Sequence, residues 1–153
     1  MNVIDIRGFS EDAIVGPNNG ATRLFIWCTT AQAGQVVGLH HHLGEELIRV
    51  LYGKLRFRVG EQVQEIGPGE VVIVDPGVAH GYVTLEDAEI EVYGEIGSGI
   101  FVMTQESGGA VREEEIFVRN APWSRIPADE SQYITRAEQL KRFRAQYEAS
   151  QFA

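Results

Sequence analysis

The chain has 153 residues, 44% of them hydrophobic, which is enough for one domain with a core of its own. Its formal net charge of −9 gives a surface that repels phosphate backbones and anionic lipids, so we expect neither nucleic acid nor a membrane as a partner. The single cysteine, Cys28, excludes an intrachain disulfide, and the sequence shows neither a signal-peptide pattern nor an apolar run of about 20 residues, so we expect a soluble, cytoplasmic protein.

The predicted elements over the first two thirds of the chain are short strands. Runs rich in Val, Ile, Phe and Tyr alternate with Gly, Pro and Asp, a pattern typical of antiparallel strands joined by tight turns. Many strands without intervening helices predict an all-β sandwich or closed barrel. In chain order we expect strands at residues 3–6, 23–27, 35–39, 46–52, 55–59, 71–74, 89–93, 100–104 and 116–118.

The end of the chain has a different pattern. Pro122 and Pro127 predict an extended covering segment, and helical periodicity follows from Thr135 to about Ala149. The apolar stripe of this helix is expected at Ile134, Ala137, Leu140, Phe143 and Tyr147. We therefore expect one domain over residues 1–153, with a barrel core at about 20–119 and the covering segment and helix at about 120–150. The helix either closes the barrel or bridges two subunits, and we expect a homodimer because small barrels often cover their exposed sheet edges by pairing.

The histidines are few and clustered. Three are consecutive, His40, His41 and His42, and the fourth is His80. Alternation along a strand places the side chains of His40 and His42 on one face and that of His41 on the other. His80 follows the turn sequence Asp75-Pro76-Gly77, which can direct it toward the same interior. The alternative interpretation, surface histidines near a loop, does not account for this clustering.

A carboxylate completes the predicted cluster. Glu46 follows His42 after a short stretch that leaves room for a turn into the next strand, so its side chain can join the two imidazoles. If that turn is one residue shorter, Glu45 takes this place. Three imidazoles and one carboxylate suit a divalent transition metal ion, namely Fe, Mn, Ni, Co, Cu or Zn.

The spacing of these residues resembles that of the cupin family. The first cupin motif, G-x5-H-x-H-x3,4-E-x6-G, matches at every position from Gly34 to Gly53. The second motif, G-x5-P-x-G-x2-H-x3-N, matches at its glycines, Gly69 and Gly77, and at its histidine, whereas its first proline and its asparagine are replaced by Asp75 and Thr84. The resemblance implies a jelly-roll barrel whose metal ligands are His40, His42, Glu46 and His80.

A metal ion with open coordination positions makes catalysis possible, so the leading hypothesis is a metal-dependent oxygenase acting on a small molecule. In this hypothesis Glu46 also accepts a proton. The alternatives are a metal-dependent isomerase or lyase that does not use oxygen, and a non-catalytic module that binds or senses a small ligand. From strand alternation, the cavity wall is expected to include Val36, Gly38, Ile48 and Val50. Arg56 and Arg58 share another strand face, either solvated or open to an anionic substrate.

Overall fold

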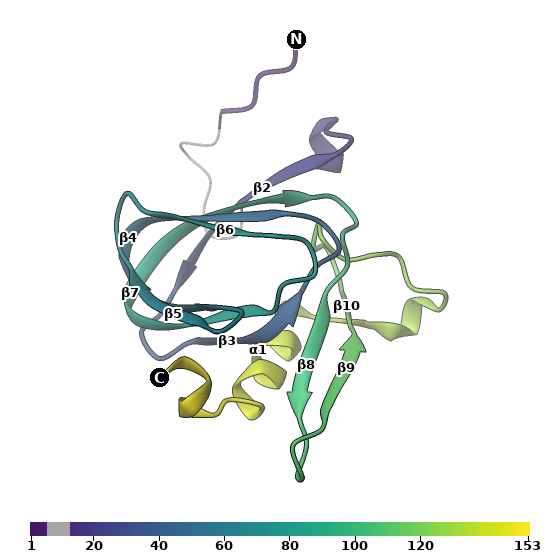
Figure 1. Cartoon of the computed structure of the whole chain (residues 1–153). Helices are drawn as coiled ribbons and strands as arrows, with labels where there is room; N and C mark the ends of the chain where they lie inside the picture. Colours follow the sequence, from purple (N-terminus) through teal and green to yellow (C-terminus); the bar gives the residue numbers. More distant parts are fainter. Residues whose placement is uncertain (6–12) are drawn as a thin grey trace.

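A computed structural model of the chain describes residues 1–5 and 13–153. It consists mainly of antiparallel strands with one α-helix near the C-terminus (Figure 1). The strands are β1 (Ala13–Val15), β2 (Leu24–Ala31), β3 (Val36–His41), β4 (Glu46–Val59), β5 (Gln62–Ile66), β6 (Val71–Val74), β7 (His80–Glu95), β8 (Phe101–Gln105), β9 (Val111–Glu115), β10 (Phe117–Val118) and β11 (Tyr133–Ile134). The helix α1 (Arg136–Ala145) is accompanied by 3-10 turns at Pro17–Asn19, Glu130–Gln132 and Ala149–Phe152.

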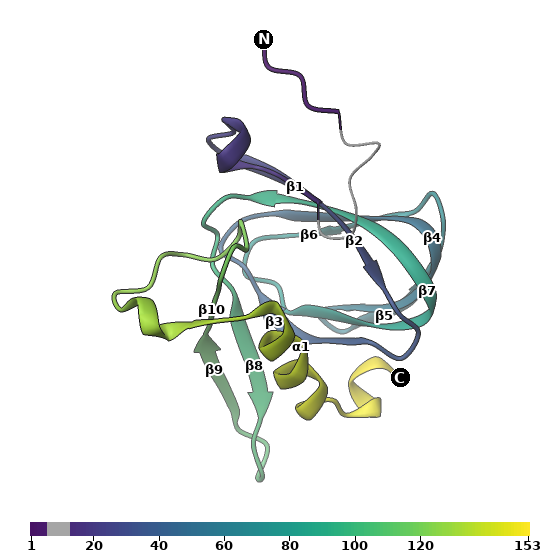
Figure 2. The same ribbon diagram turned by 180° about the vertical axis from the view of Figure 1, so that it is seen from behind.

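Two long strands form the frame of the barrel. The 14-residue β4 and the 16-residue β7 pair along most of their length, and β7 also pairs with β2 and β3. The strands curve around a common interior, as both views of the ribbon show (Figures 1 and 2). Alternate residues of these strands point inward and fill the core with aliphatic and aromatic side chains. The prediction of an all-β jelly-roll barrel with a C-terminal helix is thus confirmed.

Several expected strand boundaries are wrong. β2 and β7 extend well beyond the expected residues 23–27 and 89–93. Residues 46–52 and 55–59 belong to a single strand, β4, whose pairing with β7 is irregular between Tyr52 and Leu55. Gly53 lies there with a φ of 81°, and a Cβ at this position would be 2.1 Å from the carbonyl oxygen of Asp87. Glycine therefore permits a bulge with a close backbone approach, where the sequence indicated a turn.

Other differences concern strands with little apolar alternation. The structure forms β5 and β9, which the sequence did not predict, because these strands expose most of their side chains and so lack the pattern of a half-buried strand. β9 includes three consecutive glutamates, Glu113, Glu114 and Glu115. The expected strand at residues 3–6 is not formed at residues 3–5, and residue 6 lies outside the described part of the chain.

Helix α1 packs against β3 of its own barrel (Figure 2). The Thr135 side chain accepts a hydrogen bond of 3.1 Å from the Glu138 backbone N–H and so caps the helix, which ends at Ala145 rather than near Ala149. The buried side chains of α1 are Gln139 and Phe143. The expected stripe is thus only partly correct, because a single aromatic ring fills the contact with β3. Within the described residues, no helix has the length and apolar character needed to cross a membrane.

Candidate metal centre

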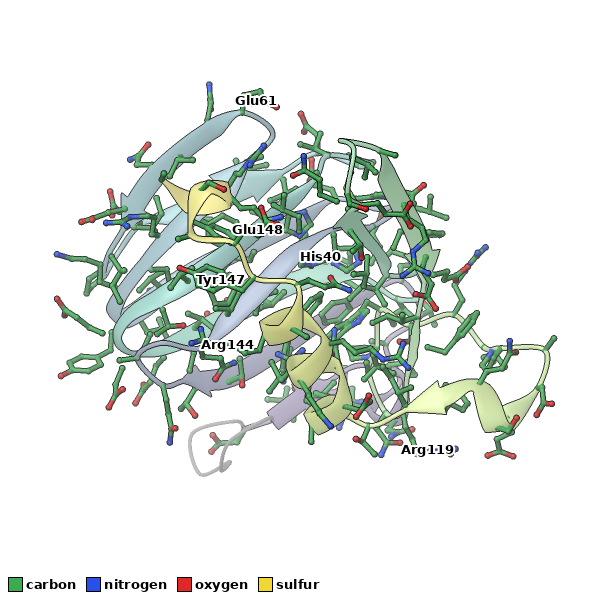
Figure 3. The ribbon with its side chains drawn as sticks, turned by 90° about the horizontal axis from the view of Figure 1, so that it is seen from below. His40, Glu61, Arg119, Arg144, Tyr147 and Glu148 are labelled. Carbon is green, nitrogen blue, oxygen red and sulfur yellow. The ribbon has the colours of Figure 1, made fainter. Side chains whose placement is uncertain are left out.

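Strand ends bring together the four residues that the sequence singled out. His40 lies on β3 directly opposite His80, the first residue of β7, and His42 follows the end of β3. Glu46 is the first residue of β4. All four side chains are buried, with exposed fractions of 7% or less. Figure 3 shows the molecule from the α1 side, with His40 labelled beside the helix.

The nitrogen and oxygen atoms of this cluster converge. One ring nitrogen from each of His40, His42 and His80 lies within 4.8 Å of the other two. The Glu46 carboxylate spans two of the rings: its Oε2 is 3.1 Å from His42 Nε2, and its Oε1 is 3.2 Å from His80 Nε2. The arrangement places nitrogen and oxygen electron pairs around a common point.

Backbone carbonyls fix the orientation of each ring. His40 Nδ1 donates to the Gly38 carbonyl at 2.8 Å, and His80 Nδ1 donates to the Val78 carbonyl at 2.9 Å. His42 Nδ1 donates to the Gly99 carbonyl. Because Nδ1 carries the proton, the Nε2 electron pair of each neutral ring is left for a ligand. The inward-facing atoms are then all electron-pair donors, so a proton or a metal ion has to lie between them.

Burial and neighbouring charges shift the pKa values in this cluster. Burial, followed by the neighbouring rings of His80 and His42, lowers the pKa of His40 well below its usual value. Burial also opposes the charged form of His42, but the charge and hydrogen bond of Glu46, with the Gly99 carbonyl, outweigh it and raise the His42 pKa. Burial likewise opposes ionisation of Glu46, yet His42 and His80 hold the pKa of that carboxyl well below its usual range. The cluster therefore favours an ionised carboxylate.

His41 and Glu45, the sequence neighbours of the clustered residues, lie outside the cluster. The His41 ring stacks on Phe101 with centroids 4.9 Å apart, and its Nε2 contacts Glu113. This is the opposite side of the strand from His40 and His42, as alternation predicted. Glu45 is exposed, whereas Glu46 is 7% exposed. The turn before β4 therefore has the longer of the two lengths considered.

The cluster lines a small cavity of about 40 Å³. Of the four expected wall residues only Ile48 lines it, and Val37 takes the place predicted for Val36. The reason is a register shift between Val37 and His40, which interrupts the alternation on which that prediction depended. Val50 is instead fully buried in the core.

Most of the remaining wall comes from residues that alternation alone did not identify. They are Phe57, Val92, Ile100 and Trp123 from the barrel and covering segment, and Arg136, Gln139 and Phe143 from α1. Trp27 on β2 and Tyr82 on β7 also line the cavity. The sequence predicted the helix that carries the α1 residues. It could not predict that this helix contacts the site, because that contact depends on tertiary packing.

The two arginines of the β4 face do not reach the cavity. Arg56 Nη2 lies 3.0 Å from Glu65 Oε1 on the neighbouring strand, and Arg58 Nη2 lies 3.6 Å from Glu61 Oε1. Neither arginine lines the cavity that contains the histidines. Of the two interpretations, the geometry favours a solvated outer face.

Residues 27–94, which include all four clustered residues, match the cupin domain family. The barrel is a cupin domain. The match ends before the covering segment and α1, so the residues that close the cupin cavity from the helix side lie outside it. A comparison with curated proteins gave no significant match.

Solved structures resemble the chain at low sequence identity. A putative sugar phosphate isomerase from Acidithiobacillus ferrooxidans is 20% identical with a TM-score of 0.53, over 68% of this chain and 74% of that chain. The TT1209 protein from Thermus thermophilus is 20% identical with a TM-score of 0.50, over 62% of this chain and 97% of that one. An RmlC-like cupin from Shewanella frigidimarina is 19% identical with a TM-score of 0.48, over 49% and 68% of the two chains. At these identities the similarity concerns the fold alone.

Proposed function

We propose that the chain is a metal-dependent oxygenase acting on a small molecule, with one divalent transition metal ion held by His40, His42, Glu46 and His80. The observation that carries this proposal is the convergence of three imidazoles whose Nδ1 atoms are all committed to backbone carbonyls. Such carbonyl contacts are the usual way in which proteins orient histidine ligands.

The spacing of the cluster fits such an ion. Two atoms each about 2.1 Å from one ion, at right angles around it, are about 3 Å apart. The contacts of Glu46 with His42 and His80, at 3.1 and 3.2 Å, have this spacing. Nitrogen and carboxylate donors without thiolate suit Fe, Mn, Ni, Co, Cu or Zn. When bound, the ion supplies open coordination positions and Lewis-acid or redox chemistry.

Beyond the four proposed ligands, the cavity wall offers little acid–base chemistry for a redox-neutral reaction. Isomerases and lyases need an acid or base near the substrate with a pKa near the working pH. Beyond the four proposed ligands, the ionisable side chains that line the cavity in the described part of the chain are Tyr82 and Arg136. Burial raises the pKa of Tyr82 to about 12, so the phenol stays protonated. Glu46, the one carboxylate among the described residues of the wall, is the residue proposed to accept a proton.

The other residues of the wall keep the site dry and shaped. Phe57 stacks on Tyr82 with centroids 5.3 Å apart, and the Phe143 ring lies 5.4 Å from that of His40. These apolar rings limit water near the cluster and leave room for a small, partly apolar substrate.

The test is a metabolite screen of metal-loaded protein, read by mass spectrometry in parallel in labelled dioxygen and under strict anaerobiosis. We expect a product that contains labelled oxygen, formed only in the aerobic arm. His80→Ala is the control for background oxidation. Turnover that is unchanged without oxygen would contradict the oxygenase and favour an isomerase or lyase. A bound molecule recovered unaltered in both arms would favour a non-catalytic binding module.

A further inference from the structure

Helix α1 directs a polar side chain into the barrel. Gln139 is 1% exposed and lies one helical turn before Phe143, so both residues belong to the helix face that packs on β3. Burying an amide costs free energy unless its polar atoms are hydrogen-bonded. Leu140, the next residue, is only half-buried, so the helix places its glutamine rather than its leucine in the interior. This arrangement indicates a role for the Gln139 side chain beyond packing.

One end of the Gln139 amide is already hydrogen-bonded. Its Oε1 accepts a hydrogen bond of 2.5 Å from Arg136 Nη1. A guanidinium carries donors only, so the amide oxygen faces it and the NH2 group lies at the other end of the amide. Among the described residues, no acceptor is hydrogen-bonded to this NH2 group. Because Gln139 lines the cavity that contains the histidines, its N–H groups are left for a molecule inside that cavity.

A second donor comes from the barrel. Tyr82 lies two residues after His80 on β7, so alternation places both side chains on the inner face of the strand. Phe57, directly opposite Tyr82 on β4, stacks on its ring with centroids 5.3 Å apart and so limits its motion. Tyr82 is 6% exposed and lines the same cavity, and its hydroxyl makes no hydrogen bond to the described part of the chain. The wall therefore holds an unused hydroxyl and an unused amide NH2 group beside the proposed ligands.

These two donors border a space of about 40 Å³, which holds only a few atoms. We propose that Tyr82 and Gln139 form a subsite for a carbonyl oxygen of the substrate. A carbonyl oxygen accepts two hydrogen bonds and brings no donor of its own, so it matches two uncharged donors better than a hydroxyl or a carboxylate does. Calling the bound molecule a substrate rests on the proposed function, whereas binding of a carbonyl requires only the two donors.

Acetone and 2-methylpropene are the probes for this subsite. They have nearly the same shape, but the carbonyl oxygen of acetone is a methylene group in 2-methylpropene. Both are titrated into the full-length protein, with Zn²⁺ and without metal, and followed through the proton–nitrogen NMR signal of the Gln139 side-chain amide. We expect acetone to shift this signal saturably in both forms. We expect 2-methylpropene to bind about tenfold more weakly, because it leaves both buried donors unpaired.

Three variants separate ligand binding from structural support, with acetone binding measured by saturation-transfer NMR. Gln139→Glu keeps an oxygen that accepts from Arg136 and removes only the amide donors, and it also assigns the amide signal by its disappearance. Gln139→Met removes the oxygen as well, and Tyr82→Phe removes the hydroxyl alone. We expect each variant to weaken acetone binding about tenfold.

The matched controls are Gln146→Glu and Tyr147→Phe, which make the same chemical changes at half-buried residues outside the cavity and should leave acetone binding unchanged. Thermal melting and metal content are measured for every variant.

Acetone binding that is normal in Gln139→Glu but lost in Gln139→Met would assign the amide to the support of Arg136 and overturn the subsite. Equal affinity for the two probes, or equal losses in the controls, would overturn it as well. If Gln139→Met does not fold, Gln139→Glu and Tyr82→Phe still decide the question. Acetone binding that depends on both donors in a protein that retains no metal would support the subsite while contradicting the proposed function.

Discussion

The three cavity histidines share one construction, in which a carbonyl holds Nδ1 and the opposite nitrogen faces the cavity. We therefore expect His40→Ala, His42→Ala and His80→Ala each to lower metal affinity at least tenfold. Loss of a residue that only orients a ligand already lowers affinity about 10- to 100-fold, and loss of the ligand itself should lower it at least as much. Metal content measured by elemental analysis after dialysis checks this. His41→Ala is the control, because that ring stacks on Phe101 outside the cluster. Equal metal loss from the His41 variant would contradict the ligand assignment.

The adjacent glutamates allow a second comparison at the residue scale. We expect Glu46→Gln to weaken metal binding at least tenfold, because it replaces a buried carboxylate that contacts both His42 and His80 with a neutral amide. Glu45→Gln makes the same chemical change one residue earlier at an exposed position and should leave affinity unchanged. Isothermal titration with Mn²⁺ or Zn²⁺ measures both. A larger effect from Glu45 than from Glu46 would move the proposed ligand by one residue.

At the scale of elements, the contact between α1 and β3 depends on one aromatic side chain. Phe143 is 1% exposed and lies over Gly38, where an added Cβ would be 3.0 Å from its Cδ1. We expect Phe143→Ala to lower the free energy of unfolding by about 3–5 kcal/mol, the range for large-to-small changes in a core. Urea denaturation followed by circular dichroism checks this. Leu140→Ala, at a half-buried position of the same helix, should lower the free energy of unfolding clearly less. Equal losses for the two variants would contradict a contact that depends on Phe143 alone and would favour the predicted apolar stripe.

The sequence predicted the elements whose side chains alternate between a dry and a wet face. β6 was predicted with its correct bounds, and the clustering of His40 with His42 followed from alternation around His41. Two kinds of feature were not predictable in this way. The bulge between Val37 and His40 reverses alternation without a local signal, so Val37 rather than Val36 reaches the cavity. The contacts of Trp123 and α1 with the site are long-range packing, which residue spacing does not encode.

At the scale of the whole molecule, an apolar row crosses the outer surface of the barrel. Ile73, Leu47, Tyr93 and Ile26 lie opposite one another on β6, β4, β7 and β2, and Ile73 is 61% exposed. Contiguous apolar surface of this kind usually marks an interface. Because α1 packs on its own barrel, this row, rather than the helix, is the surface on which we place the homodimer that the sequence predicts.

We expect light scattering to give the mass of a dimer at micromolar concentration, and Ile73→Asp to shift the protein toward the monomer by placing a charge in the apolar row. Ile126→Asp is the control, because this isoleucine is 88% exposed in the covering segment and lies outside the row. A monomeric mass for the unaltered protein would contradict the dimer. Dissociation by the Ile126 change alone would move the interface to the covering segment.

The division of the cavity between two stretches of chain has a consequence for how such proteins diversify. The four proposed ligands lie within residues 27–94, whereas Arg136, Gln139 and Phe143 come from a helix more than forty residues further on. Mutation or recombination in the distal stretch can therefore alter which molecules are accepted while the ligand set is inherited intact. For protein engineering, a library confined to the cavity-lining residues within 120–153 would vary the cavity wall while leaving the four proposed ligands unchanged.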